Sequence, residues 1–254
     1  IGLGDNEGIH PYMHQTSQAT ATLDMKRAAD EFLESISTTS NGEFFVTGYS
    51  QGGHAAMGAA KYAQENGMTE ELGLRAAAPC SGPYNLSGSQ ADLLLSDEPY
   101  SNPGYVVYLL ISYQLAYGTL YNELSDILKA PYDTQVLPFF DGNQNEYGMG
   151  AVNALLPGSL SELLVDSVLA GFSTNPNHPL RQALEDNDNF NWVPEFPVHM
   201  YYCTGDEQVD YSNSVFTDTW MNDNGAADVV AINAMEGANH GACVVPALGD
   251  VYSF

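Results

Sequence analysis

The sequence FFVTGYSQGGHAAMGAA, residues 44–60, carries three structural signals in order. It begins with a short apolar run at residues 44–46, passes through the pattern Gly-x-Ser-x-Gly at residues 48–52, and continues with small residues that suit a helix from Ala55 onward. An apolar run, a serine between glycines and a row of small residues together predict a strand, a sharp turn and a helix that packs close to the sheet.

The serine in this turn suggests a chemical role. A serine at the tip of a strand-to-helix turn is typical of a nucleophile elbow, where the backbone is strained and the hydroxyl is accessible. We expect Gly48 and Gly52 to be required because a Cβ at either position would collide with the neighbouring strand or helix. The backbone N–H of Gln51 would then face an oxyanion that develops near Ser50. The alternative is a tight turn in which Ser50 only caps the helix.

Composition narrows the class of protein. The chain has 254 residues, 44% of them hydrophobic, which is enough for one large domain with its own core. Asp and Glu number 32 against 6 Lys and Arg, a formal net charge of −26. Such a surface repels nucleic acid and anionic lipid, so neither is an expected partner. The acidic residues are scattered, which suggests a saline setting in which salt screens their repulsion and stabilises the fold.

No metal or cofactor is predicted. The segment EDNDN at residues 185–189 resembles the start of a calcium-binding loop, but Asn191 and Pro197 replace the glycine and the distal glutamate of that pattern. We therefore interpret it as a solvated turn. The three cysteines include no Cys-x-x-Cys pair and no zinc-type spacing with histidine.

Predicted strands and helices alternate on both sides of a long helical insertion. The predicted strands cover residues 44–46, 72–79, 198–203 and 227–233; the predicted helices cover residues 16–37, the segment from Ser50 to about residue 66, residues 211–222 and a short stretch at the C-terminus. This alternation favours a mostly parallel sheet flanked by helices. Within the insertion, residues 105–117 are apolar and aromatic nearly all round, and residues 119–129, 159–172 and 179–185 are predicted helices.

The residue types needed to activate a serine follow in the order Ser50, Asp206, His240. A serine hydroxyl needs a base within hydrogen-bond reach, and the base needs an orienting carboxylate. Asp206 and His240 each follow a predicted strand, and the carboxyl ends of parallel strands border the crevice of such sheets. Nucleophile, acid and histidine occur in this order in α/β-hydrolases. Asp210 is the rival for the acid.

The other histidines have weaker contexts. His54 lies inside the helix after Ser50 and is interpreted as structural or cleft-lining. His10, His14, His178 and His199 have no supporting context for the role of base, although we expect His10 and His14 to approach the cleft.

These residues divide the chain into three parts. We expect residues 1–83 to form the hydrolase core with the nucleophile elbow, residues 84–194 a helical cap or lid inserted between two sheet strands, and residues 195–254 the core with the acid and histidine loops. We expect an apolar pocket between cap and sheet, with Tyr49, Tyr84 and Tyr108 as candidate substrate-binding side chains. Most aromatic residues of the insertion are expected to pack the cap itself.

The cysteines near the acid and the histidine have two interpretations. Cys203 and Cys243 flank Asp206 and His240, so a disulfide between them is one expectation, and small buried thiols are the alternative.

The chain also resembles a known family. Its opening Gly2-Leu3-Gly4-Asp5, the segment His10-Pro11-Tyr12, and residues 24–29, DMKRAA, look like the segment after the fourth strand in secreted α/β-hydrolase esterases and lipases. The pattern is similar to the bacterial and fungal secretory lipases of the Candida antarctica lipase A type. Cutinases share the sequence around Ser50 but lack so large an insertion. The resemblance implies a serine hydrolase of carboxylic esters (EC 3.1.1 type), with an acyl-enzyme on Ser50, His240 as base and then acid, and Asp206 orienting it.

The resemblance also implies missing parts. In that family several strands and the loop with the first oxyanion donor precede the point at which this chain begins. A half-sheet would expose an edge strand, so we expect that Ile1 is not the natural start or that a separate segment completes the sheet. No signal segment is visible, and the resemblance implies a secreted, periplasmic or cell-surface enzyme.

Two other functions stay open. The same triad would serve a peptidase or amidase, although relatives of that kind usually carry a large N-terminal domain. The third hypothesis is a non-catalytic relative whose cap holds an apolar ligand. The presence of all three triad residue types argues against it. The expected substrate is a small-molecule ester or lipid.

Overall fold

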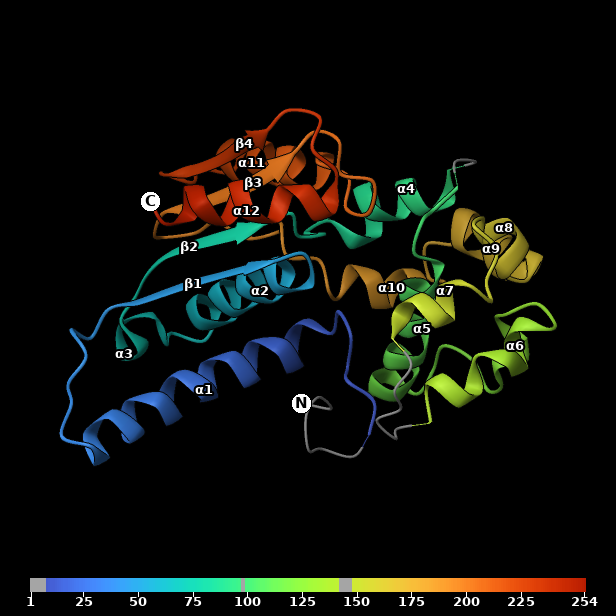
Figure 1. Ribbon diagram of the computed structural model, residues 1–254, viewed down its shortest axis with the longest axis horizontal. Coiled ribbons are helices and arrows are strands. Elements are labelled where there is room, and N and C mark those ends of the chain that lie inside the picture. The colour runs from blue at the N-terminus through green and yellow to red at the C-terminus, as the bar shows by residue number, and fades with distance from the viewer. Residues whose placement is uncertain (1–7, 97–98, 142–147) are drawn as a thin grey trace. The chain divides into compact units, whose positions relative to one another are not determined.

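The computed structural model describes residues 8–96, 99–141 and 148–254 (Figure 1). The chain separates into two compact units. The sheet unit comprises Gln15–Gln90 and Asp188–Phe254, and the helical unit comprises Ile1–His14 and Ala91–Asn187. Residues 2–5, which carry part of the family resemblance, lie outside the described residues. No helix in the described ranges is both long and apolar enough to span a bilayer.

Four parallel strands form the sheet in the order β1-β2-β3-β4. They are β1 (Phe44–Tyr49), β2 (Leu74–Cys80), β3 (Val198–Cys203) and β4 (Val229–Met235). The helical elements of this unit are α1 (Gln15–Ser35), α2 (Gln51–Glu65), α3 (Thr69–Leu72), the π-helix η1 (Leu86–Gln90), α11 (Ser212–Asp223) and α12 (His240–Val251). The predicted mostly parallel sheet flanked by helices is confirmed.

The alternation of side chains along each strand builds a core on each face of the sheet. Ala77 and Met200 belong to one buried cluster with residues of α1, α2 and α11, whereas Ala78 and Tyr201 belong to another with residues of α12. Successive strand residues point to opposite faces, so both faces of the sheet are covered by helices. This explains why the strands are continuous apolar runs rather than alternating ones.

The edge strand β1 and the helix α1 carry exposed apolar side chains. In the described ranges, β1 pairs with β2 alone and β4 with β3 alone. Phe45 on β1 is 61% exposed, and Met25, Phe32 and Ile36 of α1 are exposed as well. An unpaired strand edge presents free N–H and C=O groups to any strand that approaches it.

The helical unit is built from short elements around one longer helix. Its helices are α4 (Ala91–Leu95), α5 (Pro103–Tyr117), η2 (Leu124–Asp126), α6 (Tyr132–Gln135), η3 (Leu137–Phe139), α7 (Met149–Asn153), α8 (Leu160–Leu163), α9 (Asp166–Thr174) and α10 (Pro179–Glu185). Helix α5 starts with Pro103 and ends before Gly118, which has φ 70°. The N–H of Gly104 donates to Oδ1 of Asn153 at 2.8 Å and joins α5 to α7.

Two predicted helices in this unit are wrong, and one bridge joins the places where each is broken. Only the short η2 forms within residues 119–129, and the predicted helix at 159–172 is divided into α8 and α9. Leu128 and Leu164 form an antiparallel bridge, with Lys129 N donating to the Leu163 carbonyl at 2.8 Å. Both leucines are buried, and the bridge requires extended backbone at both, so it divides the second predicted helix and prevents the first from reaching Lys129.

Of the segment predicted as a solvated turn, residues 185–189, the first two residues are exposed and the last three are buried. Asp188 and Asn189 have 4% and 0% of their surface exposed. The carboxylate of Asp188 accepts hydrogen bonds from the N–H and hydroxyl of Ser87, and Nδ2 of Asn189 donates to the His54 carbonyl at 2.9 Å. These polar side chains pair with neighbouring groups inside the sheet unit, which satisfies them away from water.

Helix α2 packs closely against β1 through Gly48 and against β2 through Gly53, whereas a side chain at Gly52 would meet no neighbour. A Cβ on Gly48 would lie 2.2 Å from the Gly52 carbonyl oxygen, and one on Gly53 would lie 2.4 Å from the Cys80 carbonyl oxygen. A Cβ on Gly52 would meet no heavy atom within 4 Å. The expectation for Gly48 is therefore confirmed and that for Gly52 is wrong, because the backbone of Gly52 lies against β1 but a Cβ on it would point into open space.

The two neighbouring glycines provide a matched pair. Gly53→Ala is expected to lower the free energy of unfolding by about 1–3 kcal/mol because the backbone must shift around the new methyl group. Gly52→Ala is expected to change it by less than about 1 kcal/mol, with any effect favouring the helix. Urea denaturation followed by circular dichroism measures both, and equal losses in the two variants would contradict the packing described above.

Candidate active site

Ser50 occupies the turn between β1 and α2 with a strained backbone. Its φ is 59° and its ψ is −121°, a conformation that side-chain-bearing residues rarely adopt. Its N–H donates to the Cys80 carbonyl at 2.9 Å, and its carbonyl accepts from the N–H of His54 at 3.1 Å. The end of β2 and the first turn of α2 therefore hold the turn from both sides. The N–H of Gln51 belongs to the first residue of α2, as the sequence predicts.

His240 is the first residue of α12 rather than part of a preceding loop. Asn239 caps this helix, with its side chain accepting from the N–H of Ala242 at 2.9 Å. Nε2 of His240 lies 2.9 Å from Oγ of Ser50. Nδ1 of His240 lies 2.7 Å and 2.9 Å from the two carboxylate oxygens of Asp206. The structure thus joins Ser50, His240 and Asp206 by hydrogen bonds in the predicted order.

Asp206 is fixed by the turn that follows β3. Its Oδ1 accepts hydrogen bonds from the N–H groups of Gln208 at 3.0 Å and Val209 at 2.9 Å, and only 1% of its side chain is exposed. A Cβ on Gly205 would lie 2.5 Å from the Gly237 carbonyl oxygen, so the turn runs close against the loop that leads to His240. A carboxylate that accepts two backbone N–H groups is held in one orientation.

The rival acid Asp210 has a different position. Its Oδ1 accepts from the N–H of Ser212 at 2.8 Å, at the start of α11, and its carbonyl accepts from the side chain of Asn213 at 3.0 Å. These are contacts of a residue that begins a helix, while Asp206 is the carboxylate bonded to His240.

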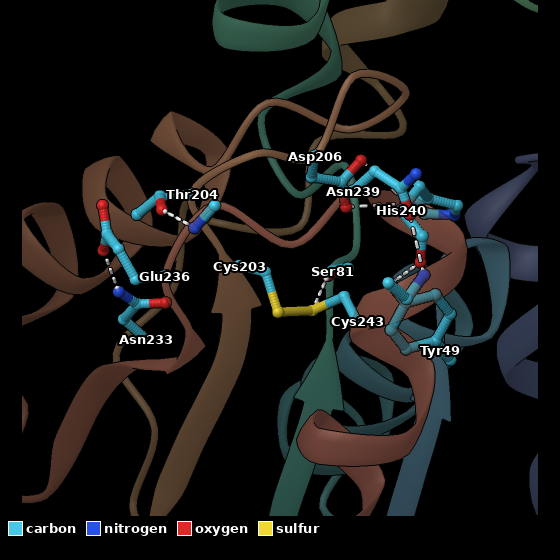
Figure 2. Close-up of a disulfide and its surroundings, with 12 residues drawn as sticks. Tyr49, Ser81, Cys203, Thr204, Asp206, Asn233, Glu236, Asn239, His240 and Cys243 are labelled. Carbon is cyan, nitrogen blue, oxygen red and sulfur yellow. Dashed lines mark hydrogen bonds and ion pairs between the residues drawn. A yellow bond between two sulfur atoms is a disulfide. The ribbon is translucent and has the colours of Figure 1, made fainter.

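A disulfide joins the segments that carry Asp206 and His240 (Figure 2). Cys203 is the last residue of β3 and Cys243 lies in the first turn of α12, with 5.9 Å between their Cα atoms. Each cysteine is three residues from the candidate site residue on its segment, so the bond limits how far these two side chains can separate. Cys80 is a buried free thiol, and burial raises its pKa to about 12.

Tyr49 is bonded to the backbone of His240. Its hydroxyl donates to the His240 carbonyl at 2.6 Å, and the two ring centroids are 5.1 Å apart. Burial raises the pKa of Tyr49 to about 12, with the Asp206 charge acting in the same direction and a hydrogen bond with Ser81 opposing it, so the phenol is a neutral donor. The role in substrate binding stays a prediction, and the hydroxyl already has a partner within the site.

Glu207 is a site residue that sequence reasoning missed. Its Oε2 accepts from the N–H of His240 at 3.0 Å. Burial alone would raise the pKa of this carboxyl, but hydrogen bonds from backbone N–H groups and from Gln208, together with the nearby His240, bring it below its usual value. No sequence signal beyond its adjacency to Asp206 points to this contact, which depends on where α12 begins.

The remaining two tyrosine candidates lie elsewhere. Tyr84 has none of its surface exposed and belongs to the same buried cluster as Met57 and Trp192, so a substrate has no access to it there. Tyr108 lies on α5 in the helical unit, where it stacks on Tyr12 with 4.9 Å between ring centroids. Its substrate role stays a prediction.

The other histidines have partners outside the Ser50 site. Nδ1 of His54 lies 2.9 Å from Oε1 of Gln18 in the buried interior, in agreement with a structural role. The rings of His10 and His14 contact Tyr108 and Tyr117, and His178 contacts Phe172, all within the helical unit. His199 lies 3.0 Å from Asp228. Within the described ranges, no cluster of three or more His, Cys, Asp or Glu could hold a metal ion.

Fold and comparison agree on the class of protein. The parallel sheet with a strained serine turn is that of an α/β-hydrolase, and solved structures of this fold that resemble the chain include esterases and lipases. No protein-family model and no curated protein sequence matches the chain.

The esterase LipA from Xanthomonas oryzae, described as degrading rice cell walls, is 27% identical, with a TM-score of 0.86 over 100% of this chain and 67% of its own. A Legionella pneumophila protein described as a hydrolase is 21% identical, with a TM-score of 0.88 over 100% of this chain and 67% of its own. Candida antarctica lipase A is 18% identical, with a TM-score of 0.72 over 96% of this chain and 55% of its own. The last two show likeness of fold alone, and the chain spans about two thirds of LipA's length. The predicted resemblance is confirmed.

The disulfide gives a direct chemical prediction. When the protein is unfolded without reductant, iodoacetamide is expected to modify one cysteine, Cys80, and after reduction it should modify all three. Intact mass spectrometry counts the adducts, and Cys80→Ser provides the control with no adduct before reduction. Three adducts in the unreduced chain would show that Cys203 and Cys243 are not paired.

Proposed function

We propose that the protein is a serine hydrolase that cleaves carboxylic esters. The observation that carries this proposal is the continuous hydrogen-bond path from Asp206 through both ring nitrogens of His240 to the Ser50 hydroxyl. Ser50 is also held in the backbone conformation of a nucleophile elbow. The esterase LipA, at 27% identity, adds support for the ester class.

The first half of the reaction forms an acyl-enzyme. Nε2 of His240 takes the Ser50 hydroxyl proton as Oγ attacks the ester carbonyl carbon, and the carbonyl π electrons move to its oxygen. Asp206 stabilises the imidazolium that results, and the N–H of Gln51 donates to the oxyanion. When the carbonyl re-forms, the bond to the alcohol oxygen breaks and the departing alkoxide takes the proton from His240.

The second half reverses these roles with water. His240 takes a proton from a water molecule whose oxygen attacks the acyl carbon. Collapse of the second tetrahedral intermediate breaks the bond to Ser50 Oγ, which recovers its proton from His240. The carboxylic acid leaves and the enzyme returns to its starting state.

We retain the proposal that a further segment completes the sheet and supplies a second oxyanion donor. The outer edge of β1, unpaired within the described ranges, and the exposed Phe45 beside it are compatible with an added strand. Loss of one oxyanion donor typically lowers the rate by two to three orders of magnitude, so such a segment would matter for activity as well as for stability.

We also propose that the protein works in an oxidising compartment outside the cytoplasm, as a secreted, periplasmic or cell-surface enzyme. The Cys203–Cys243 disulfide supports this location because such bonds persist where thiols are not kept reduced.

Covalent labelling tests the nucleophile. A fluorophosphonate is expected to add once, on Ser50, at neutral pH, and peptide mapping by mass spectrometry locates the adduct. Ser50→Ala should lose both the adduct and hydrolysis of p-nitrophenyl acetate while its circular dichroism spectrum stays that of the parent protein. If the parent protein took up no label, both ester and amide hydrolysis would be ruled out, and the hypothesis of a non-catalytic ligand-binding protein would remain.

The choice of acid is tested by two matched substitutions. Asp206→Asn is expected to lower kcat by about three to four orders of magnitude, because the amide neither stabilises the imidazolium nor selects the required tautomer. Asp210→Asn keeps an oxygen that can accept the Ser212 N–H, so kcat should change by less than about threefold. Steady-state kinetics with one ester measures both, and equal losses would refute the assignment of Asp206.

A further inference from the structure

The peptide groups of His240 are anchored on both sides of its Cα. Its N–H donates to Oε2 of Glu207 at 3.0 Å, and its carbonyl accepts from the Tyr49 hydroxyl at 2.6 Å. The ring is held separately by Asp206. The direction in which the imidazole points therefore depends on two backbone contacts as well as on the acid.

The location of His240 in α12 raises an electrostatic difficulty. The N-terminus of a helix carries a partial positive charge, which opposes the formation of a cationic imidazolium on its first residue. In the described ranges, the ionisable side chains hydrogen-bonded to His240 are Asp206 on its ring and Glu207 and Tyr49 on its backbone. Tyr49 is neutral, so among these hydrogen-bonded groups the two carboxylates carry the opposing charge.

Glu207 and Asn239 serve different positions of the helix. Asn239 accepts the N–H of Ala242, at the third position of α12, while Glu207 accepts the N–H of His240, at the first position. Helix starts leave several N–H groups without partners, and each cap satisfies one of them. Asn239 therefore does not replace the contact made by Glu207.

We propose that Glu207 is a positioning residue for His240: its carboxylate binds the N–H that opens α12 and supplies a second negative charge beside the imidazolium formed during the reaction. This proposal rests on the proposed role of His240 as the base. Glu207 would act through His240 and would not contact the substrate.

The test compares Glu207→Gln with Glu236→Gln. Glutamine keeps an oxygen acceptor for the His240 N–H and removes the charge. Glu236 is an exposed carboxylate four residues before His240 whose bonding partner is Asn233, and Figure 2 shows it on the far side of the disulfide from His240. Both substitutions change the net charge equally.

The kinetic readout is the pH profile of kcat/KM for p-nitrophenyl acetate. In Glu207→Gln, loss of the anion makes protonation of His240 less favourable, so the acid limb should move to lower pH by about 0.2–0.7 unit. At the plateau, kcat should fall about two- to fivefold with KM nearly unchanged, because the charge acts on the transition state. Glu236→Gln should match the parent protein in both quantities.

A second readout separates this proposal from the proposed function. In a Ser50→Ala background, the NMR titration of the His240 ring signal, assigned by its loss in His240→Gln, requires no activity. A downward shift of its midpoint with Glu207→Gln but not with Glu236→Gln supports the positioning role even in a protein that hydrolyses nothing. The positioning role would be overturned if Glu207→Gln moved neither the midpoint of the NMR titration nor the acid limb of the pH profile. If activity still required Ser50, the proposed function would stay intact.

Discussion

The close approach of the start of α2 to the end of β2 is the constraint on which the site depends. The N–H of Ser50 is bonded to the Cys80 carbonyl, and Gly53 lies where any side chain would strike that same oxygen. This contact keeps Ser50 at φ 59°, a conformation that is unfavourable by itself and persists only where surrounding structure enforces it. The turn therefore obtains its geometry from packing between a helix and a strand, and the serine hydroxyl is carried to a fixed place at the edge of the sheet.

The remaining members of the site are brought to Ser50 by the ends of β3 and β4. Asp206 lies in the turn after β3, and His240 begins the helix that follows β4. The Cys203–Cys243 disulfide ties these segments together, and Gly205 allows their backbones to pass within contact distance. Glu207 and Tyr49 hold the backbone of His240, so this residue is restrained by contacts from two different strand ends. Such restraint matters because small misplacements of a reacting group cost large factors in rate.

Sequence alone predicted the elements whose signals are local. The strand, turn and helix around Ser50 follow from glycine spacing and small residues, and the order Ser50, Asp206, His240 follows from strand ends. The interruption of two helices by the Leu128–Leu164 bridge was not predictable, because it is a contact between residues far apart in sequence. The same applies to Asp188 and Asn189, whose polar character suggested solvent although both are buried and bonded to Ser87 and to the His54 backbone. The contact between Glu207 and the N–H of His240 was not predictable either, because it depends on α12 beginning at His240 itself.

The central claim is that Ser50, His240 and Asp206 act as one catalytic unit. The most direct measurement compares kcat for His240→Ala with kcat for the double variant Asp206→Asn/His240→Ala, using one ester under one set of conditions. Residues that act as a unit give non-additive losses, so the double variant should equal His240→Ala within about threefold. The opposite result is a double variant that is slower than His240→Ala by the full factor that Asp206→Asn produces on its own. That result would mean that Asp206 works independently of His240, and it would contradict the central claim.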